Sequence, residues 1–185
     1  MLDVYQAYLD NTMDIYTTIE EKYLRAVDEL NYGESPQGLR LLNEIIASDN
    51  RYARAHYQLG MIYYYQIKDY QTAGYHYKTC AELEPLFPDV YYHYMHLAVF
   101  LNMERLVNHI KAKALTIPGA DTSGIYELSG LYLERQKNWE SAIAEYRRAL
   151  IEATDDVKSE RIQEAINRAA GKAKQMLACN YQLIA

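Results

Sequence analysis

The sequence predicts an all-α protein built from stacked pairs of antiparallel helices. Apolar residues recur at three- and four-residue spacing almost throughout, no segment shows the alternation of a strand, and similar positions recur about every 35 residues. A repeat of that length indicates a solenoid, in which each helix pair buries apolar surface against its neighbours. The recurring positions form five series: Leu59, Tyr94 and Leu128; Tyr63, Ala98 and Tyr132; Gly38, Ala73, Val107 and Ala142; Leu42, Tyr77, Lys111 and Tyr146; and Ile45, Cys80, Ala114 and Ala149.

The N-terminal region, residues 1–30, carries one apolar stripe and predicts a long helix, or two helices with a break near residues 10–12. Asn31 to Glu34 end this region. We expect Ser35 to cap the next helix, with Pro36 in its first turn, because serine and proline favour those positions.

The remaining helices follow as pairs separated by turn signals. We expect a last helix over 156–181, capped by Asp155 and Asp156, with one polar face that suits the end of a solenoid. Because no linker is long enough to separate domains, we expect a single domain over 1–185, with repeat helices over 35–153. The predicted pairs are 52–66 with 70–83, 88–101 with 104–115, and 122–135 with 139–153.

Two of these pairs resemble the tetratricopeptide repeat (TPR). Both have seven residues from one central aromatic to the next, Tyr63 to Tyr70 and Tyr132 to Trp139, which is one more than usual and predicts a longer turn. The third pair is degenerate, since Met95 and Lys111 replace signature residues. The matching residues are His56, Leu59, Gly60, Tyr63, Tyr70, Ala73, Tyr77, Cys80 and Pro85, and then Ile125, Leu128, Ser129, Tyr132, Trp139, Ala142, Tyr146 and Ala149.

The resemblance implies a right-handed superhelical solenoid whose concave surface comes from the first helix of each pair and binds a peptide or partner helix. Tyr57, Tyr92 and Tyr126 occupy equivalent positions and would form a ladder suited to apolar, aromatic or proline-rich peptide. The alternative is that these tyrosines pack between repeats. The lysine and asparagine clamp of chaperone-binding family members is absent. The candidate partner-binding residues are Tyr57, Met61, Tyr64, Tyr65, Tyr92, His96, Phe100 and Tyr126.

Composition argues against several other classes. The net charge of −6, with 19 basic and 25 acidic residues, disfavours nucleic acid and electrostatic membrane anchoring. No apolar run reaches the roughly 20 residues that cross a bilayer, and two isolated cysteines favour the cytoplasm. We expect Cys80 to be buried, His56 to pack against its neighbouring helix and His76 to face solvent.

The sequence predicts no cofactor and no metal, because His93, His96 and possible neighbour His109 lack an acidic or cysteine partner. We found no catalytic constellation. The predicted function is therefore a non-enzymatic protein-interaction module, an adaptor or scaffold that holds a peptide or partner segment. The alternatives are a homo- or hetero-oligomeric assembly subunit, a secretion-type chaperone that holds a client segment, and an enzyme with a pocket that the sequence does not reveal.

Overall fold

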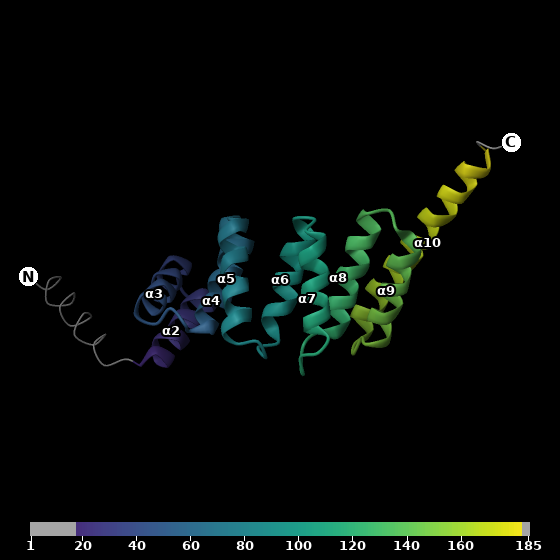
Figure 1. Cartoon of the computed structure of the whole chain (residues 1–185). Coiled ribbons are helices and arrows are strands. Elements are labelled where there is room, and N and C mark those ends of the chain that lie inside the picture. The colour runs from purple at the N-terminus through teal and green to yellow at the C-terminus, as the bar shows by residue number, and fades with distance from the viewer. Residues whose placement is uncertain (1–17, 183–185) are drawn as a thin grey trace, which may run out of the picture. The chain divides into compact units, whose positions relative to one another are not determined.

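The structure is a computed structural model that describes residues 18–182, with side chains described for 18–177. This part of the chain is helical and contains no strand (Figure 1). It divides into two compact units, the first ending at Leu83 and the second beginning at Glu84. Residues 1–17 of the predicted N-terminal helix or helices over 1–30 lie outside the described residues.

The first unit contains two helix pairs. α2 (Ile19–Tyr32) packs against α3 (Ser35–Ser48), and α4 (Ala53–Ile62), extended by the π-helix η1 (Tyr63–Ile67), packs against α5 (Tyr70–Leu83). α2 begins where the Thr18 hydroxyl accepts from the Glu21 amide and the Glu21 carboxylate accepts from the Thr18 amide, a capping box. The buried core of these helices consists of Ala26, Leu41, Leu42, Ile45, Ala55, Leu59 and Ile62.

The start of α3 differs from the prediction in one respect. Pro36 lies in the first turn, as expected, but Ser35 is already helical and Glu34 is the N-cap residue, without a side-chain hydrogen bond to the helix. Ser35 is therefore not a cap.

The second unit contains α6 (Asp89–Phe100), α7 (Glu104–Ala114), α8 (Thr122–Arg135), α9 (Trp139–Ile151) and α10 (Asp156–Gln182). α6 packs against α7 and α8, α8 against α9, and α9 against α10, which extends past α9 in Figure 1. The Asp155 carboxylate accepts from the Lys158 amide and caps α10. α10 buries one apolar stripe and leaves a polar face open, as a capping helix does. A core cluster joins α9 to α10: Ala142, Tyr146, Ala149, Ile162, Ala165, Ile166 and Ala169.

Two glycines let the paired helices approach closely, and they correct the predicted repeat register. A Cβ atom on Gly60 would lie 2.6 Å from the ring of Tyr77, and one on Gly130 would lie 2.6 Å from the ring of Tyr146. Because the two contacts are the same, Gly130 is the counterpart of Gly60. The repeat alignment in the sequence analysis places Ser129 at that position, one residue too early.

The turns between paired helices support the corrected register. Lys68, Asn102 and Lys137 all have left-handed backbone conformations, with φ of 67°, 57° and 61°. Lys68 follows Gly60 by eight residues, whereas Lys137 follows Gly130 by seven. The second repeat therefore has an extra residue and the fourth has none. The π-helix η1 absorbs the extra residue, so the predicted longer turn is wrong for both pairs.

Candidate interaction surface

The corrected register changes the predicted tyrosine ladder. Glu127, rather than Tyr126, is the fourth-repeat counterpart of Tyr57 and Tyr92. One repeat further on, Arg161 of α10 follows Glu127 by 34 residues. Along this row the side chains therefore change from aromatic to charged.

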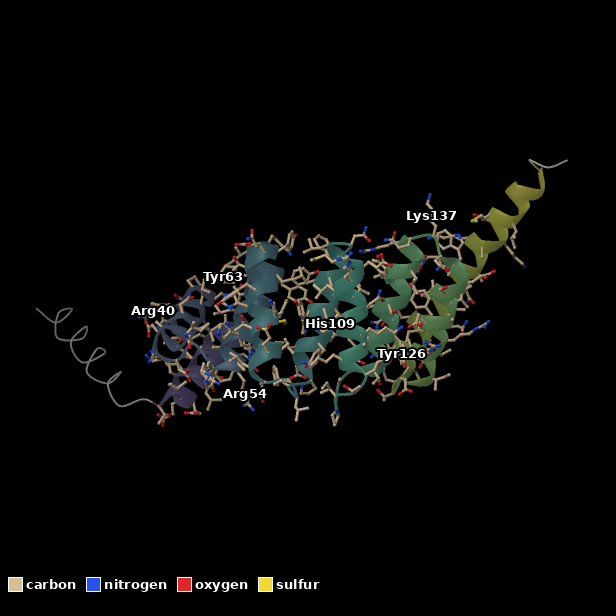
Figure 2. The ribbon with its side chains drawn as sticks, viewed as in Figure 1. Arg40, Arg54, Tyr63, His109, Tyr126 and Lys137 are labelled. Atoms are coloured by element: carbon tan, nitrogen blue, oxygen red, sulfur yellow. The ribbon has the colours of Figure 1, made fainter. Side chains whose placement is uncertain are left out.

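Tyr126 occupies the bulky signature position instead. Its ring is half-buried and packs against the α9 and α10 core. Figure 2 labels Tyr126. Lys111 Nζ lies 5.6 Å and the Arg148 guanidinium carbon 6.0 Å from the centroid of its ring, so both cations lie over it. Tyr126 therefore does not occupy the repeat position of Tyr57 and Tyr92, and part of its ring packs against the core. A role of Tyr126 in partner binding stays a prediction.

A pocket of about 300 Å³ lies in the second unit between α6, α8 and α10. It contains two of the sequence-predicted residues, Tyr92 and His96. α6 and α8, each the first helix of a repeat, and the capping helix α10 supply all but one of its lining residues. The remaining residue, Tyr146, comes from α9. The lining residues are Tyr92, His96, Glu127, Leu128, Leu131, Tyr146, Arg161, Ala165 and Arg168.

Two bidentate ion pairs join α10 to α8 at the edge of this pocket. Arg161 donates from Nε and Nη2 to the Glu127 carboxylate at 2.9 and 2.7 Å. Arg168 donates in the same way to Glu134 at 2.9 and 2.8 Å, and Lys172 donates to Glu134 at 2.9 Å. Such pairs fix the planar guanidinium in orientation as well as in position.

Glu134 is the most deeply buried of these acidic residues. Its side chain is 6% exposed, and it also accepts from the Tyr146 hydroxyl at 2.8 Å. The hydrogen bonds from Arg168 lower the pKa of Glu134 to about 2 against an opposing effect of burial, with Lys172 and Tyr146 contributing further. Glu134 is therefore ionised at neutral pH.

Tyr92 and His96 form the apolar end of the pocket. Their ring centroids lie 6.4 Å apart, and a Cβ atom on Gly124 would lie 2.8 Å from the Tyr92 ring, so this ring rests on α8. Burial raises the pKa of Tyr92, and the charge of Glu127 adds to that effect. Burial also lowers the pKa of His96. At neutral pH both side chains are uncharged and present ring faces.

The other predicted site residues do not line this pocket. Met61 is half-buried and its sulfur accepts from the Tyr77 hydroxyl at 3.5 Å. Tyr64 is only 5% exposed and has little surface for a ligand, whereas Tyr65 and Phe100 are 39% and 47% exposed. Tyr57 is half-buried. A role in partner binding stays a prediction for these residues.

His56 and His76 form a buried pair between α4 and α5. Their Nδ1 atoms are 3.0 Å apart, and His56 Nε2 lies 3.0 Å from the Asn50 carbonyl oxygen. Because that oxygen can only accept a hydrogen bond, His56 carries its proton on Nε2, and its Nδ1 accepts a hydrogen bond from His76 Nδ1–H. His56 packs against its neighbouring helix as predicted, but the prediction that His76 faces solvent is wrong.

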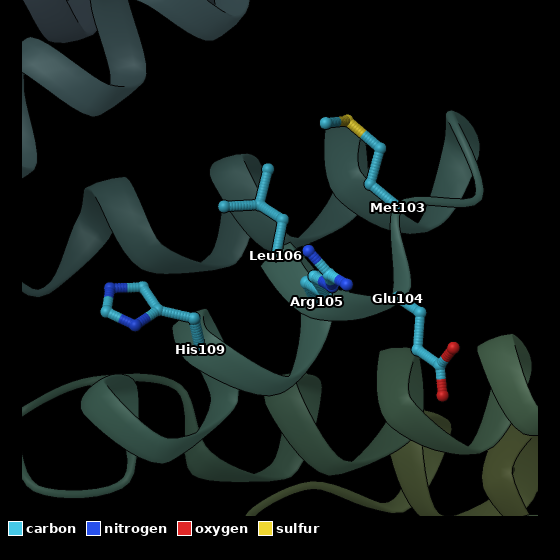
Figure 3. A pocket seen from close by; sticks show the side chains of 5 residues that line it. All are labelled: Met103, Glu104, Arg105, Leu106 and His109. Carbon is cyan, nitrogen blue, oxygen red and sulfur yellow. The ribbon is translucent and has the colours of Figure 1, made fainter.

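A second depression, of about 600 Å³, lies at the start of α7 (Figure 3). All its lining residues come from one short stretch, so it does not gather groups from several elements. They are Met103, Glu104, Arg105, Leu106 and His109. Within the described part of the chain, no group of three or more histidine, cysteine or acidic residues could hold a metal ion.

The sequence analysis missed Glu127, Arg161 and Arg168. A signal was present, because Glu127 and Glu134 each precede their arginine partner by 34 residues, the length of one repeat. Once Gly130 is aligned with Gly60, this spacing is seen to join equivalent positions of two successive repeats.

Comparison with known proteins supports the fold. No protein-family model matches the chain, and no curated protein matches it in sequence. A crystal structure of MamA superposes with a TM-score of 0.68 at 18% identity, covering 80% of this chain and 85% of that one. A structure of MamA residues 41–end from Desulfovibrio magneticus RS-1 gives 0.64 at 16% identity, covering 89% and 96%. A MamA RS-1 ArsTM double mutant gives 0.64 at 15%, covering 85% and 96%.

At this level of identity the likeness is one of fold alone. The predicted fold class is confirmed: the chain is an all-α, TPR-like solenoid. None of the described helices combines the length and the apolar character that crossing a bilayer requires.

Proposed function

We propose that this chain is a non-enzymatic interaction scaffold that holds a segment of a partner protein. The segment binds to the surface formed by the first helices of the repeats. TPR-like solenoids are suited to this role, because stacked helix pairs create extended binding surfaces. The observation that carries the proposal is the pocket between α6, α8 and α10. It combines half-buried aromatic rings with fixed polar groups, the composition of sites that bind ligands in a defined orientation.

Photo-crosslinking tests this proposal directly. Benzoylphenylalanine in place of Leu131, which lines the pocket, is expected to trap a partner from a lysate of the source organism. The same group in place of Asn108, exposed on α7, is the control and should not trap that partner. The crosslinked peptide, read by mass spectrometry, identifies the bound segment.

Two tyrosine variants then separate the pocket from the general surface. Tyr92→Ala should reduce the crosslink, because it removes a ring from the pocket, whereas Tyr32→Ala should not, because Tyr32 is 90% exposed on α2. Circular dichroism establishes that both variants are folded. Equal capture at Leu131 and Asn108, or capture that is indifferent to Tyr92→Ala, contradicts the proposal.

A second candidate function, subunit of an assembly, is favoured by the end of α10. Met176 and Leu177 are 52% and 57% exposed there, beyond the part of α10 that forms the core with α9. Exposed apolar side chains grouped on a helix are typical of an interface. If α10 mediates assembly, Met176→Lys/Leu177→Lys lowers the mass measured by light scattering. A mass equal to one chain for the wild-type protein excludes self-assembly.

A further inference from the structure

At the pocket between α6, α8 and α10, basic side chains are more accessible than acidic ones, which the sequence alone does not show. In each bidentate pair at its edge, the acidic partner is covered and the basic partner is exposed. Glu127 and Glu134 are 20% and 6% exposed, whereas Arg161 and Arg168 are 57% and 49% exposed. A molecule that enters the pocket therefore meets two largely exposed guanidinium groups and, of the two carboxylates, only the mostly covered one of Glu127.

The hydrogen-bonding capacity of the pocket is equally one-sided. Each carboxylate oxygen of Glu127 and Glu134 already accepts a hydrogen bond from arginine. Each arginine uses Nε and Nη2 for its carboxylate. Arg168 also interacts with the Tyr146 hydroxyl, whereas Arg161 Nη1 has no hydrogen-bond partner among the residues that the structure describes. Glu134 accepts four hydrogen bonds, which fills its carboxylate, and Glu127 accepts two and is mostly covered. The donors on the more exposed guanidinium groups therefore favour an anionic ligand.

The spacing of the two arginines favours more than one anionic group. Arg161 and Arg168 are seven residues apart on α10, or about 10 Å at the rise of an α-helix. One terminal carboxylate contacts only one of them. In an extended segment, side chains two residues apart lie on one face about 7 Å apart, and the lengths of the arginine and acidic side chains cover the difference.

The uncharged end of the pocket indicates which side chain the ligand should carry beside its acidic groups. Tyr92, His96 and Leu131 present ring and aliphatic surface that fits an apolar side chain. We propose that the partner is an extended acidic segment, in which one apolar residue is followed by two acidic residues at alternate positions. This inference rests on the proposed function, since it names the chemistry of the segment that the same pocket holds.

Peptide binding to the whole chain, measured by fluorescence anisotropy, tests this inference. The probe is dye-labelled Ser-Leu-Ser-Glu-Ser-Glu-Ser-amide, which places the three side chains on one face. We expect glutamine in place of both glutamates to weaken binding at least about tenfold, the value of one charge-assisted hydrogen bond. A lysine version should bind more weakly still. The glutamine version with a free C-terminus tests a terminal carboxylate, and equal binding by it would overturn the choice of internal acidic side chains.

Variants of the protein should change the affinity for the glutamate probe in opposite directions. Arg161→Gln/Arg168→Gln should abolish the preference for the glutamate probe, while Arg147→Gln, on the exposed face of α9, should leave it unchanged. Glu127→Gln should strengthen binding of the glutamate probe, because it removes a negative charge and leaves an acceptor for Arg161. Loss of fold cannot cause that gain, so this variant keeps the test decisive if the arginine variants unfold.

The possible outcomes separate the two proposals. If photo-crosslinking at Leu131 identifies a partner segment without acidic residues, the proposed function holds and the acidic segment is wrong. If the glutamate and glutamine probes bind equally, or Glu127→Gln weakens binding, the acidic segment is also wrong. If neither crosslinking nor any probe reports occupancy of the pocket, both proposals fall.

Discussion

At the scale of single residues, two small side chains report how the helices pack. A Cβ atom on Gly130 would lie 2.6 Å from the Tyr146 ring, whereas a Cβ atom on Gly171 of α10 would lie in open space. The same substitution at the two positions therefore has opposite effects. The contrast also tests the corrected register, since only the residue facing Tyr146 needs to lack a Cβ atom.

We expect Gly130→Ala to destabilise the second unit by about 1–3 kcal/mol, because the new methyl group overlaps an aromatic ring that cannot move aside. Gly171→Ala should stabilise it by up to about 1 kcal/mol through helix propensity alone. Urea unfolding followed by the fluorescence of Trp139, the only tryptophan in the chain, measures both. A neutral Gly130→Ala would contradict the assignment of Gly130 as the counterpart of Gly60.

At the scale of elements, η1 is the clearest departure from repeat regularity. The π-helix holds one residue more than the equivalent end of α8, and the following turn keeps its length. Hydrophobic periodicity cannot reveal such an insertion, because the apolar pattern of Tyr63–Ile67 also fits an ordinary helix end.

Deletion of one residue tests this interpretation. Removal of Gln66, an exposed residue of η1, should convert the π-turn to α-helix and change the free energy of unfolding by less than about 1 kcal/mol. Removal of Arg135 at the end of α8 should cost more than about 2 kcal/mol, because no extra residue is present there. Circular dichroism during urea unfolding measures the free energy of unfolding of both deletion variants. The control Arg135→Ala removes the side chain but keeps the register. Equal costs would argue against an insertion in η1.

The histidine pair links α4 to α5 and makes their packing sensitive to pH. Burial lowers the pKa of His56, and burial together with the neighbouring His56 lowers the pKa of His76 to about 4. The rings around the pair belong to Tyr63 and Tyr75.

Because both folded-state pKa values are lowered, the unfolded chain binds protons first on acidification. The stabilisation is complete above pH 6.5 and is lost as the pH falls towards about 4. We expect a loss on the order of 2 kcal/mol in the first unit, visible as faster hydrogen exchange in α4 and α5. His76→Gln keeps a donor to His56 and should flatten this dependence. A pH profile unchanged by His76→Gln would show that the pair is not its source.

At the scale of the whole molecule, most of the fold could be predicted from sequence and part of the site could not. The second helices of the pairs carry small residues such as Ala73 and Ala142 at fixed spacing, and both are fully buried. In α8 two adjacent registers were compatible with the signature, because Leu128 and Ser129 are both buried. A shift of one residue moved Tyr126 into the ladder and hid Glu127.

The site residues predicted from sequence are divided between the two units. Tyr57, Met61, Tyr64 and Tyr65 belong to the first unit, whereas every residue that lines the pocket between α6, α8 and α10 belongs to the second. Each of the two core clusters lies within a single unit as well. The second unit thus contains its own core, its own capping helix and a complete pocket.

We therefore expect a fragment of residues 84–185 to fold on its own and to keep the pocket. In a solenoid, stability is approximately a sum over repeats and their neighbours, so removal of distant repeats leaves the remaining contacts intact. The fragment should unfold cooperatively by Trp139 fluorescence and bind the glutamate probe within about threefold of the whole chain. An unfolded fragment would show that residues 1–83 are required for folding of the second unit. A folded fragment that loses the probe would place essential binding residues, with Tyr57 the first candidate, in the first unit.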